Sequence, residues 1–131
     1  MRSATIYGRE IEMQGSPYTF LVYRKAFGGD LLKAIIEAYQ SSPIDVSLLL
    51  QVVWAMVKTN DEQTPDYADW LREFDPEEFA VNELEWVGEV DGVINAELFR
   101  GKKTQTAKRV FIRIRRAIAR RMERLAKRLS A

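Results

Sequence analysis

The positions of apolar side chains along the chain predict a short β-hairpin followed by several helices. Residues 4–13 partly alternate between apolar and polar side chains, with a break at Gly8 where a bulge or turn fits. After the turn-forming residues 14–17, Tyr18–Tyr23 is rich in aromatic and β-branched residues and predicts a strand. We expect these two segments to form one hairpin, which must pack on helices because two strands alone are not stable in water.

Three helices are predicted in the centre of the chain. Asp30 can cap a helix over residues 31–40, whose apolar residues fall on one face. A second helix, about residues 44–58, is apolar on nearly every side, which is typical of the buried centre of a bundle. Thr64 can cap a third, short helix that starts at Pro65.

A further helix is predicted from Pro76 to about residue 99, after Asp75 as its cap. Gly88 and Gly92 weaken its middle by about 1 kcal/mol each, so a break there stays open. Three tryptophans lie on the apolar faces of separate predicted helices, and we expect them in the core: Trp54, Trp70 and Trp86.

The last predicted helix, Thr104–Leu129, has an apolar stripe on one side and basic residues on the other, and it would be roughly 39 Å long. Residues 100–131 hold thirteen of the twenty Lys and Arg residues and one acid, a formal charge of +12. Residues 1–99 hold seven basic residues and eighteen acids, a formal charge of −11. We therefore divide the chain into an acidic body, residues 1–99, and a basic arm, residues 100–131.

These elements predict an α+β, mainly α fold, in which an N-terminal β-hairpin packs on a small helical bundle and a C-terminal basic amphipathic helix follows. The chain has 131 residues, of which 47% are hydrophobic, enough for one real core. The N-terminal residues lack the apolar segment and cleavage site of a signal peptide. The longest apolar run, Ser47–Val57, is too short to span a bilayer, so we expect a soluble intracellular protein.

The absence of cysteine and histidine restricts the chemistry of the chain. It removes the thiolate nucleophile, the usual general base and the commonest zinc ligands. The remaining carboxylate runs, such as Glu73–Glu78, fit a solvated acidic face or a docking surface better than a metal or acid–base site. Gly28-Gly29-Asp30 precedes a helix but matches no phosphate-binding motif. We expect no enzymatic activity, no metal and no cofactor.

The arm has four interpretations. The first is a solvated surface, but thirteen positive charges exceed what solubility alone needs. The second is binding to a membrane surface, which lacks the support of a lipid-anchor motif. Binding to nucleic acid fits the arginines, although the charge of the body would repel phosphates. Assembly with protein ranks first, because a partner protein can satisfy both faces of the helix. The expected partner-binding residues are Phe111, Ile114, Ile118, Leu125 and Leu129 on the stripe and Arg109, Arg113, Arg116, Arg120 and Arg124 opposite.

Residues 5–98 resemble the tail assembly chaperones of long-tailed bacteriophages, particularly those that infect Gram-positive hosts. The motifs are G-x-x-Y-T-F-x-V at Gly15–Val22, L-L-x-x-V-W-A-M-V-K at Leu49–Lys58 and T-P-x-Y-x-x-W-L at Thr64–Leu71. The resemblance implies a non-enzymatic protein of the bacterial host cytoplasm that binds the tape measure protein, helps recruit the tail tube protein, self-associates and leaves the finished virion. Many such proteins also have a longer, frameshifted form. The arm matches no general pattern of this family.

Overall fold

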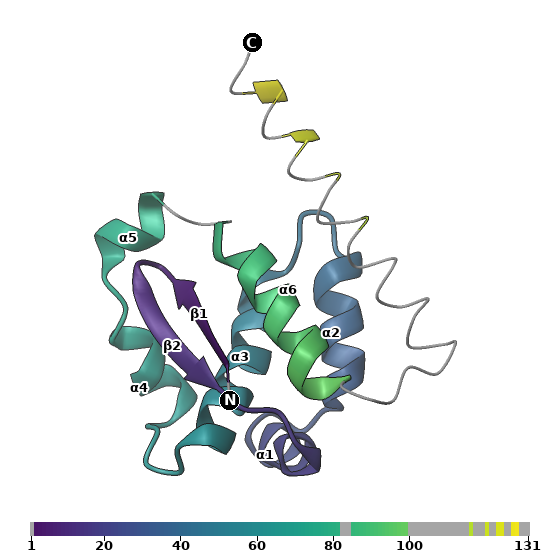
Figure 1. Ribbon diagram of the computed structural model, residues 1–131, viewed down its shortest axis with the longest axis vertical. Coiled ribbons are helices and arrows are strands. Elements are labelled where there is room, and N and C mark those ends of the chain that lie inside the picture. The colour runs from purple at the N-terminus through teal and green to yellow at the C-terminus, as the bar shows by residue number, and fades with distance from the viewer. Residues whose placement is uncertain are drawn as a thin grey trace.

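A computed structural model describes residues 2–81 and 85–99 together with six positions of the arm: 116, 120, 123, 124, 127 and 128. Its elements are β1 (Arg2–Ile6), β2 (Arg9–Met13), α1 (Pro17–Phe27), α2 (Leu31–Gln40), α3 (Val46–Asn60), α4 (Tyr67–Arg72), α5 (Pro76–Val81) and α6 (Glu85–Leu98) (Figure 1). The predicted α+β, mainly α fold with an N-terminal hairpin is confirmed.

The hairpin lies entirely within residues 2–13. β1 and β2 pair antiparallel, and the pair Ile6 and Arg9 closes a two-residue turn. The turn residues Tyr7 and Gly8 both have positive φ, 50° and 78°, as a type I′ hairpin turn requires. The predicted pairing of residues 4–13 with a strand at 18–23 is therefore wrong, and the break at Gly8 is the hairpin turn itself.

Residues 18–23 lie in helix α1, in spite of their preference for strands. Ser16 caps this helix, and its side chain and that of Thr19 form a reciprocal capping box. Pro17 occupies the first turn, and Gly28 ends the helix in the left-handed conformation at φ 77°. These start and stop signals, together with the packing of one face on α3, outweigh the intrinsic propensity of the aromatic and β-branched residues.

Helix α3 is the centre of the fold, as predicted from its apolar sequence. It packs against α1, α2 and β2, while α6 packs on β1. The inward-facing hairpin residues Ala4, Ile6, Ile11 and Met13 join its buried side chains in one core. The helix begins at Val46, two residues later than predicted, because Asp45 caps it by accepting a hydrogen bond of 3.0 Å from the Leu48 N–H.

The segment after α3 differs from its prediction at one boundary. Helix α4 begins at Tyr67 rather than Pro65, and Thr64 does not cap it: the Thr64 hydroxyl donates to the Asp61 carbonyl at 2.6 Å. The predicted helix after Asp75 appears as α5 and α6, and α6 runs uninterrupted through both Gly88 and Gly92. The predicted burial of the three tryptophans is confirmed, with exposures of 5% for Trp54, 2% for Trp70 and 1% for Trp86.

Candidate functional site

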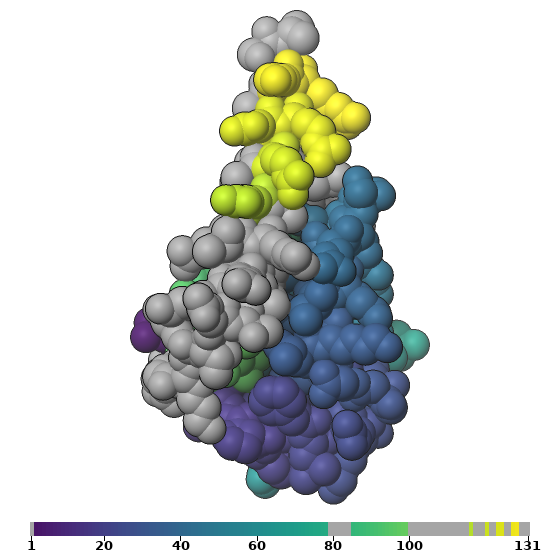
Figure 2. Space-filling view, turned by 90° about the vertical axis from the view of Figure 1, so that its right-hand side faces the viewer, coloured from purple at the N-terminus to yellow at the C-terminus, as the bar shows by residue number. Residues whose placement is uncertain are grey.

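The structure describes three of the predicted partner-binding residues of the arm. Arg116, Arg120 and Arg124 are helical and exposed, and their spacing of four places them along one side of the helix. The Arg120 Nε donates to the Arg116 carbonyl at 3.3 Å. The described arm positions project beyond the end of the body (Figures 1 and 2), so these arginines are accessible to a partner. Arg109, Phe111, Arg113, Ile114, Ile118, Leu125 and Leu129 lie outside the described residues.

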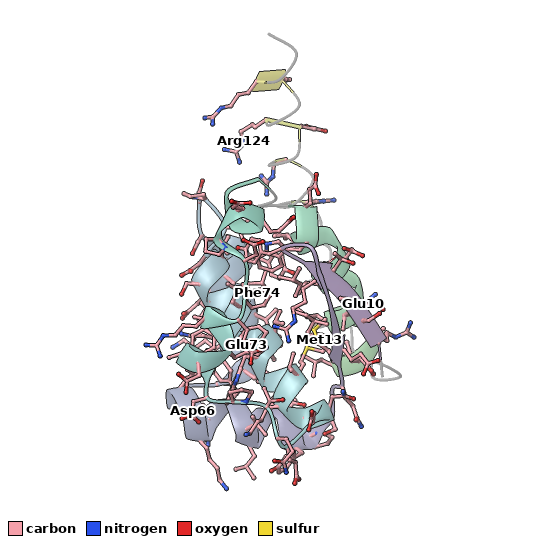
Figure 3. The ribbon with its side chains drawn as sticks, turned by 90° about the vertical axis from the view of Figure 1, so that its left-hand side faces the viewer. Glu10, Met13, Asp66, Glu73, Phe74 and Arg124 are labelled. Atoms are coloured by element: carbon pink, nitrogen blue, oxygen red, sulfur yellow. The ribbon has the colours of Figure 1, made fainter. Side chains whose placement is uncertain are left out.

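Three exposed carboxylates of the body can be located on one side of it. Figure 3 faces this side, where Glu10 on β2, Asp66 before α4 and Glu73 after α4 are labelled, and Arg124 lies beyond the end of the body. All three carboxylates are exposed. These carboxylates come from segments far apart in the chain, and the acidic face stays a prediction.

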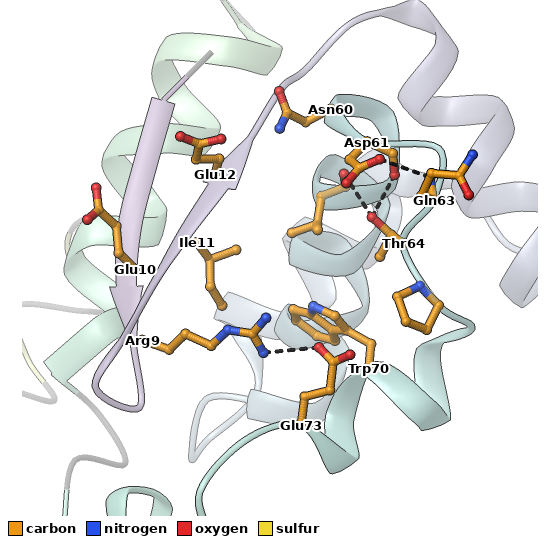
Figure 4. A pocket seen from close by; sticks show the side chains of 12 residues that line it. Arg9, Glu10, Ile11, Glu12, Asn60, Asp61, Gln63, Thr64, Trp70 and Glu73 are labelled. Carbon is orange, nitrogen blue, oxygen red and sulfur yellow. Dashed lines mark hydrogen bonds and ion pairs between the residues drawn. The ribbon is translucent and has the colours of Figure 1, made fainter.

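Within this side, a groove of about 480 Å³ lies between β2 and the segment that joins α3 to α4 (Figure 4). We call it the acidic groove. It is lined by residues 9–12 of β2 and by Asp61 and Glu73, and the Arg9 guanidinium pairs with the Glu73 carboxylate at 3.1 Å. The side chains of Glu10 and Glu12 point to the other face of β2 (Figure 4), where the Glu10 carboxylate accepts from the Ser3 hydroxyl at 3.1 Å. Asp61 and Glu73 against Arg9 leave the groove with a net formal charge of −1, and the carboxylates of Glu10 and Glu12 lie beside it, so the groove is suited to a cationic segment.

The edge of β2 forms one wall of the acidic groove. Because Ile6 and Arg9 form the pair that closes a two-residue turn, the backbone N–H and C=O groups of Glu10 and Glu12 are directed away from β1. Within the described residues, these groups make no backbone hydrogen bond outside the hairpin. A partner in this groove can therefore use backbone hydrogen bonds as well as charge.

Hydrogen bonds fix the opposite wall of the groove. Asp61 accepts from the Gln63 N–H at 3.0 Å, and the Lys58 ammonium donates to the carbonyls of Glu62 at 3.0 Å and Thr64 at 2.7 Å. The Trp54 indole N–H donates to the Pro65 carbonyl at 2.9 Å. This segment is thus anchored to α3 at several points, and the charge of Lys58 is directed at backbone oxygens rather than at the groove carboxylates.

A second, apolar pocket of about 370 Å³ lies where the hairpin turn meets α3 and α4. We call it the apolar pocket. It is lined by Tyr7, Val46, Ser47, Leu50, Tyr67, Leu71 and Phe74. Tyr7 and Phe74 pack edge to face with ring centroids 5.7 Å apart, and Phe74 packs in the same way on Trp70 at 4.9 Å. The pocket therefore has an aromatic wall continuous with the core.

Tyr67 links two sides of this pocket. Its hydroxyl donates to the Ser47 carbonyl at 3.2 Å, which joins α4 to the first turn of α3. Burial raises the pKa of Tyr67; the hydrogen bond to Ser47 opposes this effect, and the nearby Asp45 adds to it. The phenol therefore stays neutral and remains a hydrogen-bond donor at physiological pH.

Sequence reasoning missed both cavities. The acidic groove combines strand residues 9–12 with residues 57–73, and the apolar pocket combines Tyr7 with residues 46–50 and 67–74. The sequence does hold a signal for the second, because Tyr67 and Leu71 belong to the T-P-x-Y-x-x-W-L motif. No local signal places the edge of β2 beside Asp61.

Among the residues that the structure describes, no group of three or more Asp and Glu side chains is arranged to hold a metal ion. In the same part of the chain, no helix combines the length and the hydropathy needed to cross a lipid bilayer. Comparisons with protein-family models, with curated proteins and with solved structures found no match to this chain.

Proposed function

We propose that this protein is a non-catalytic tail assembly chaperone of a long-tailed bacteriophage, which binds the tape measure protein and helps recruit the tail tube protein. The observation that carries the proposal is the division of charge between two accessible surfaces: the acidic groove of the body and the exposed arginines of the arm. The motifs of residues 5–98 supply the resemblance to this family. One chain thus offers two binding surfaces of opposite sign.

The client implied by the resemblance is a long, largely helical chain that aggregates when it is left alone. Such a client needs a partner that covers apolar stripes and also binds flanking charges. The acidic groove can bind basic segments of the client, and the apolar pocket can cover a large apolar side chain of its stripe. The arm provides the reverse charge for acidic segments of the client.

The decisive experiment is co-expression with the tape measure protein, with the soluble fraction of that client as the readout. We expect the full chain to keep the client soluble and to copurify with it. The variant Glu10→Gln, Glu12→Gln, Asp61→Asn removes three charges in and beside the groove with little change in shape, and it should reduce copurification.

The matched control is Glu37→Gln, Glu89→Gln, Asp30→Asn. It removes the same number and type of charges at exposed positions outside the groove, and an asparagine at position 30 can still cap α2. The control should behave like the unmodified chain. A client that stays insoluble with the full chain, or equal losses for both variants, would contradict the proposal.

Binding to nucleic acid is the second candidate, because Arg116, Arg120 and Arg124 form an exposed row at a spacing of four residues. Such a row can neutralise several phosphates, and the affinity would then fall steeply with salt. Titration of duplex DNA at low and at physiological salt separates the two candidates. No binding at low salt removes this one.

A further inference from the structure

We infer that the apolar pocket is the docking site for the arm of a second copy of this chain. The inference rests on the proposed function as an assembly protein and deepens it, because it assigns a place on the body to self-association. The occupant is the apolar stripe of the amphipathic arm, with Phe111 and Ile114 as its anchors.

The first argument is the composition and exposure of the pocket. Val46, Tyr67, Leu71 and Phe74 are partly exposed, although each contributes an apolar surface to the same cavity. Apolar side chains at the mouth of a cavity gain from being covered, at roughly 25 cal/mol for each Å² removed from water. The ring contacts of Phe74 with Tyr7 and Trp70 hold one wall in place, so the cavity is formed before a partner arrives.

The second argument is the charge beside the pocket. Asp45 directly precedes the lining residue Val46, and it lies close enough to Tyr67 to affect its pKa. Asp75 directly follows the lining residue Phe74. Neither carboxylate forms an ion pair within the described part of the chain. An apolar side chain that enters the pocket from a helix with flanking arginines therefore meets both apolar surface and opposite charge.

The arm has the matching pattern. Phe111, Ile114 and Ile118 follow one another at intervals of three and four residues, and a basic residue lies within two positions of each. All six arm positions that the structure describes are helical. A helix with an apolar stripe and a cationic flank matches an apolar pocket with acidic neighbours, because its apolar side chains meet apolar surface and its arginines meet opposite charge.

The occupant belongs to a second copy, because the described arm positions extend away from their own body. Arg116, Arg120 and Arg124 are exposed, and in Figures 1 and 3 this end of the arm lies beyond the body rather than over α4 and the hairpin turn. The division into an acidic body and a basic arm also favours association between copies, since each copy carries both complementary parts.

The test uses the absence of cysteine from the chain, which gives disulfide trapping no background. The full-length variants Leu71→Cys and Phe111→Cys, carrying tags of different mass, are mixed and oxidised mildly. We expect a disulfide-linked heterodimer. The control pairs Phe111→Cys with Leu32→Cys and should give little heterodimer. Leu32 is an exposed apolar position on α2 (37% exposed) that lies outside the pocket. Far-UV circular dichroism of each variant checks that it is folded.

The double variant Leu71→Cys, Phe111→Cys separates the two possible sources of the arm. A cross-linked dimer or larger species supports the inference, whereas an exclusively monomeric intrachain disulfide shows that the pocket takes its own arm and overturns it. Folded variants that give no disulfide, or equal yields with Leu71→Cys and Leu32→Cys, also overturn it.

A charge variant gives an independent readout. Asp45→Asn, Asp75→Asn removes both carboxylates while an asparagine keeps each capping hydrogen bond available. We expect about three- to tenfold weaker self-association by analytical ultracentrifugation. Asp30→Asn, Glu37→Gln should leave it unchanged. Because client solubility in co-expression is measured separately, loss of this inference and loss of the proposed function are distinguishable.

Discussion

The hydroxyl of Thr19 on α1 lies 2.9 Å from the hydroxyl of Thr59 on α3, and this contact joins the start of one helix to the end of the other. Thr59 donates to the Ala55 carbonyl at 2.7 Å, so Thr19 is the donor between the two hydroxyls. Thr19 in turn accepts from the Ser16 N–H at 3.1 Å. The relay couples the capping box of α1 to the central helix.

Replacement of Thr19 by valine should destabilise the protein by about 1–3 kcal/mol, because it keeps the shape of a fully buried side chain but leaves the Ser16 N–H without its partner. Urea unfolding followed by circular dichroism measures the change. Thr5→Val, at an exposed position of β1, is the control and should have little effect. Equal stability of Thr19→Val and the unmodified chain would contradict the importance of the relay.

Tyr39 gives a prediction about alkaline pH. Burial raises the pKa of its phenol above the ordinary value, and the nearby Asp91 raises it further. The unfolded chain releases this proton near pH 10 whereas the folded protein retains it. The contribution to stability is therefore complete below about pH 10 and is lost as the pH rises above that value. Tyr39→Phe should make this alkaline loss shallower, as measured by thermal unfolding between pH 8 and 11.

At neutral pH the same substitution should be tolerated. The Tyr39 hydroxyl is buried and has no hydrogen-bond partner within the described residues. Its removal leaves no described group without a partner, so we expect a stability within about 1 kcal/mol of the unmodified chain. A larger loss at pH 7 would show that the hydroxyl makes a stabilising contact.

Two glycines should respond in opposite directions to alanine. A methyl group at Gly15 would lie 2.8 Å from the Glu97 Cβ and 2.9 Å from its backbone carbon, so Gly15→Ala should cost about 1–3 kcal/mol through displacement of α6. Gly92 lies in α6 with nothing within 4 Å of the added methyl, and Gly92→Ala should stabilise by about 0.5–1 kcal/mol. Thermal melts of both variants provide the measurement, and each serves as the control for the other.

Self-association should weaken as salt rises. The charges of arm and body are opposite, and many of them are exposed. Salt therefore screens their attraction at separations beyond about 10 Å at 0.1 M and beyond about 3 Å at 1 M. Light scattering of the full chain at both salt concentrations should show smaller species at the higher one. A size that does not change would mean that charge does not hold the copies together.

The helical body could be predicted from sequence because its signals are local. Asp30 caps α2 as predicted, and the apolar run of α3 marks the buried centre of the fold. The strand predicted at residues 18–23 failed for an instructive reason. Intrinsic β propensity there competes with a capping box and a leading proline, and the helix also buries Thr19, Val22 and Tyr23 against the rest of the fold.

The sequence by itself determined the division of charge, the helical periods of the body and the burial of the three tryptophans, because each depends on residue type and spacing along one segment. Only the tertiary structure decided that the edge of β2 lies opposite Asp61 across a groove and that Tyr7 meets Leu71 and Phe74 at a pocket. These placements depend on how the hairpin lies against α3 and α4. That packing is the sum of many weak contacts between residues distant in the chain, and no single local pattern encodes it.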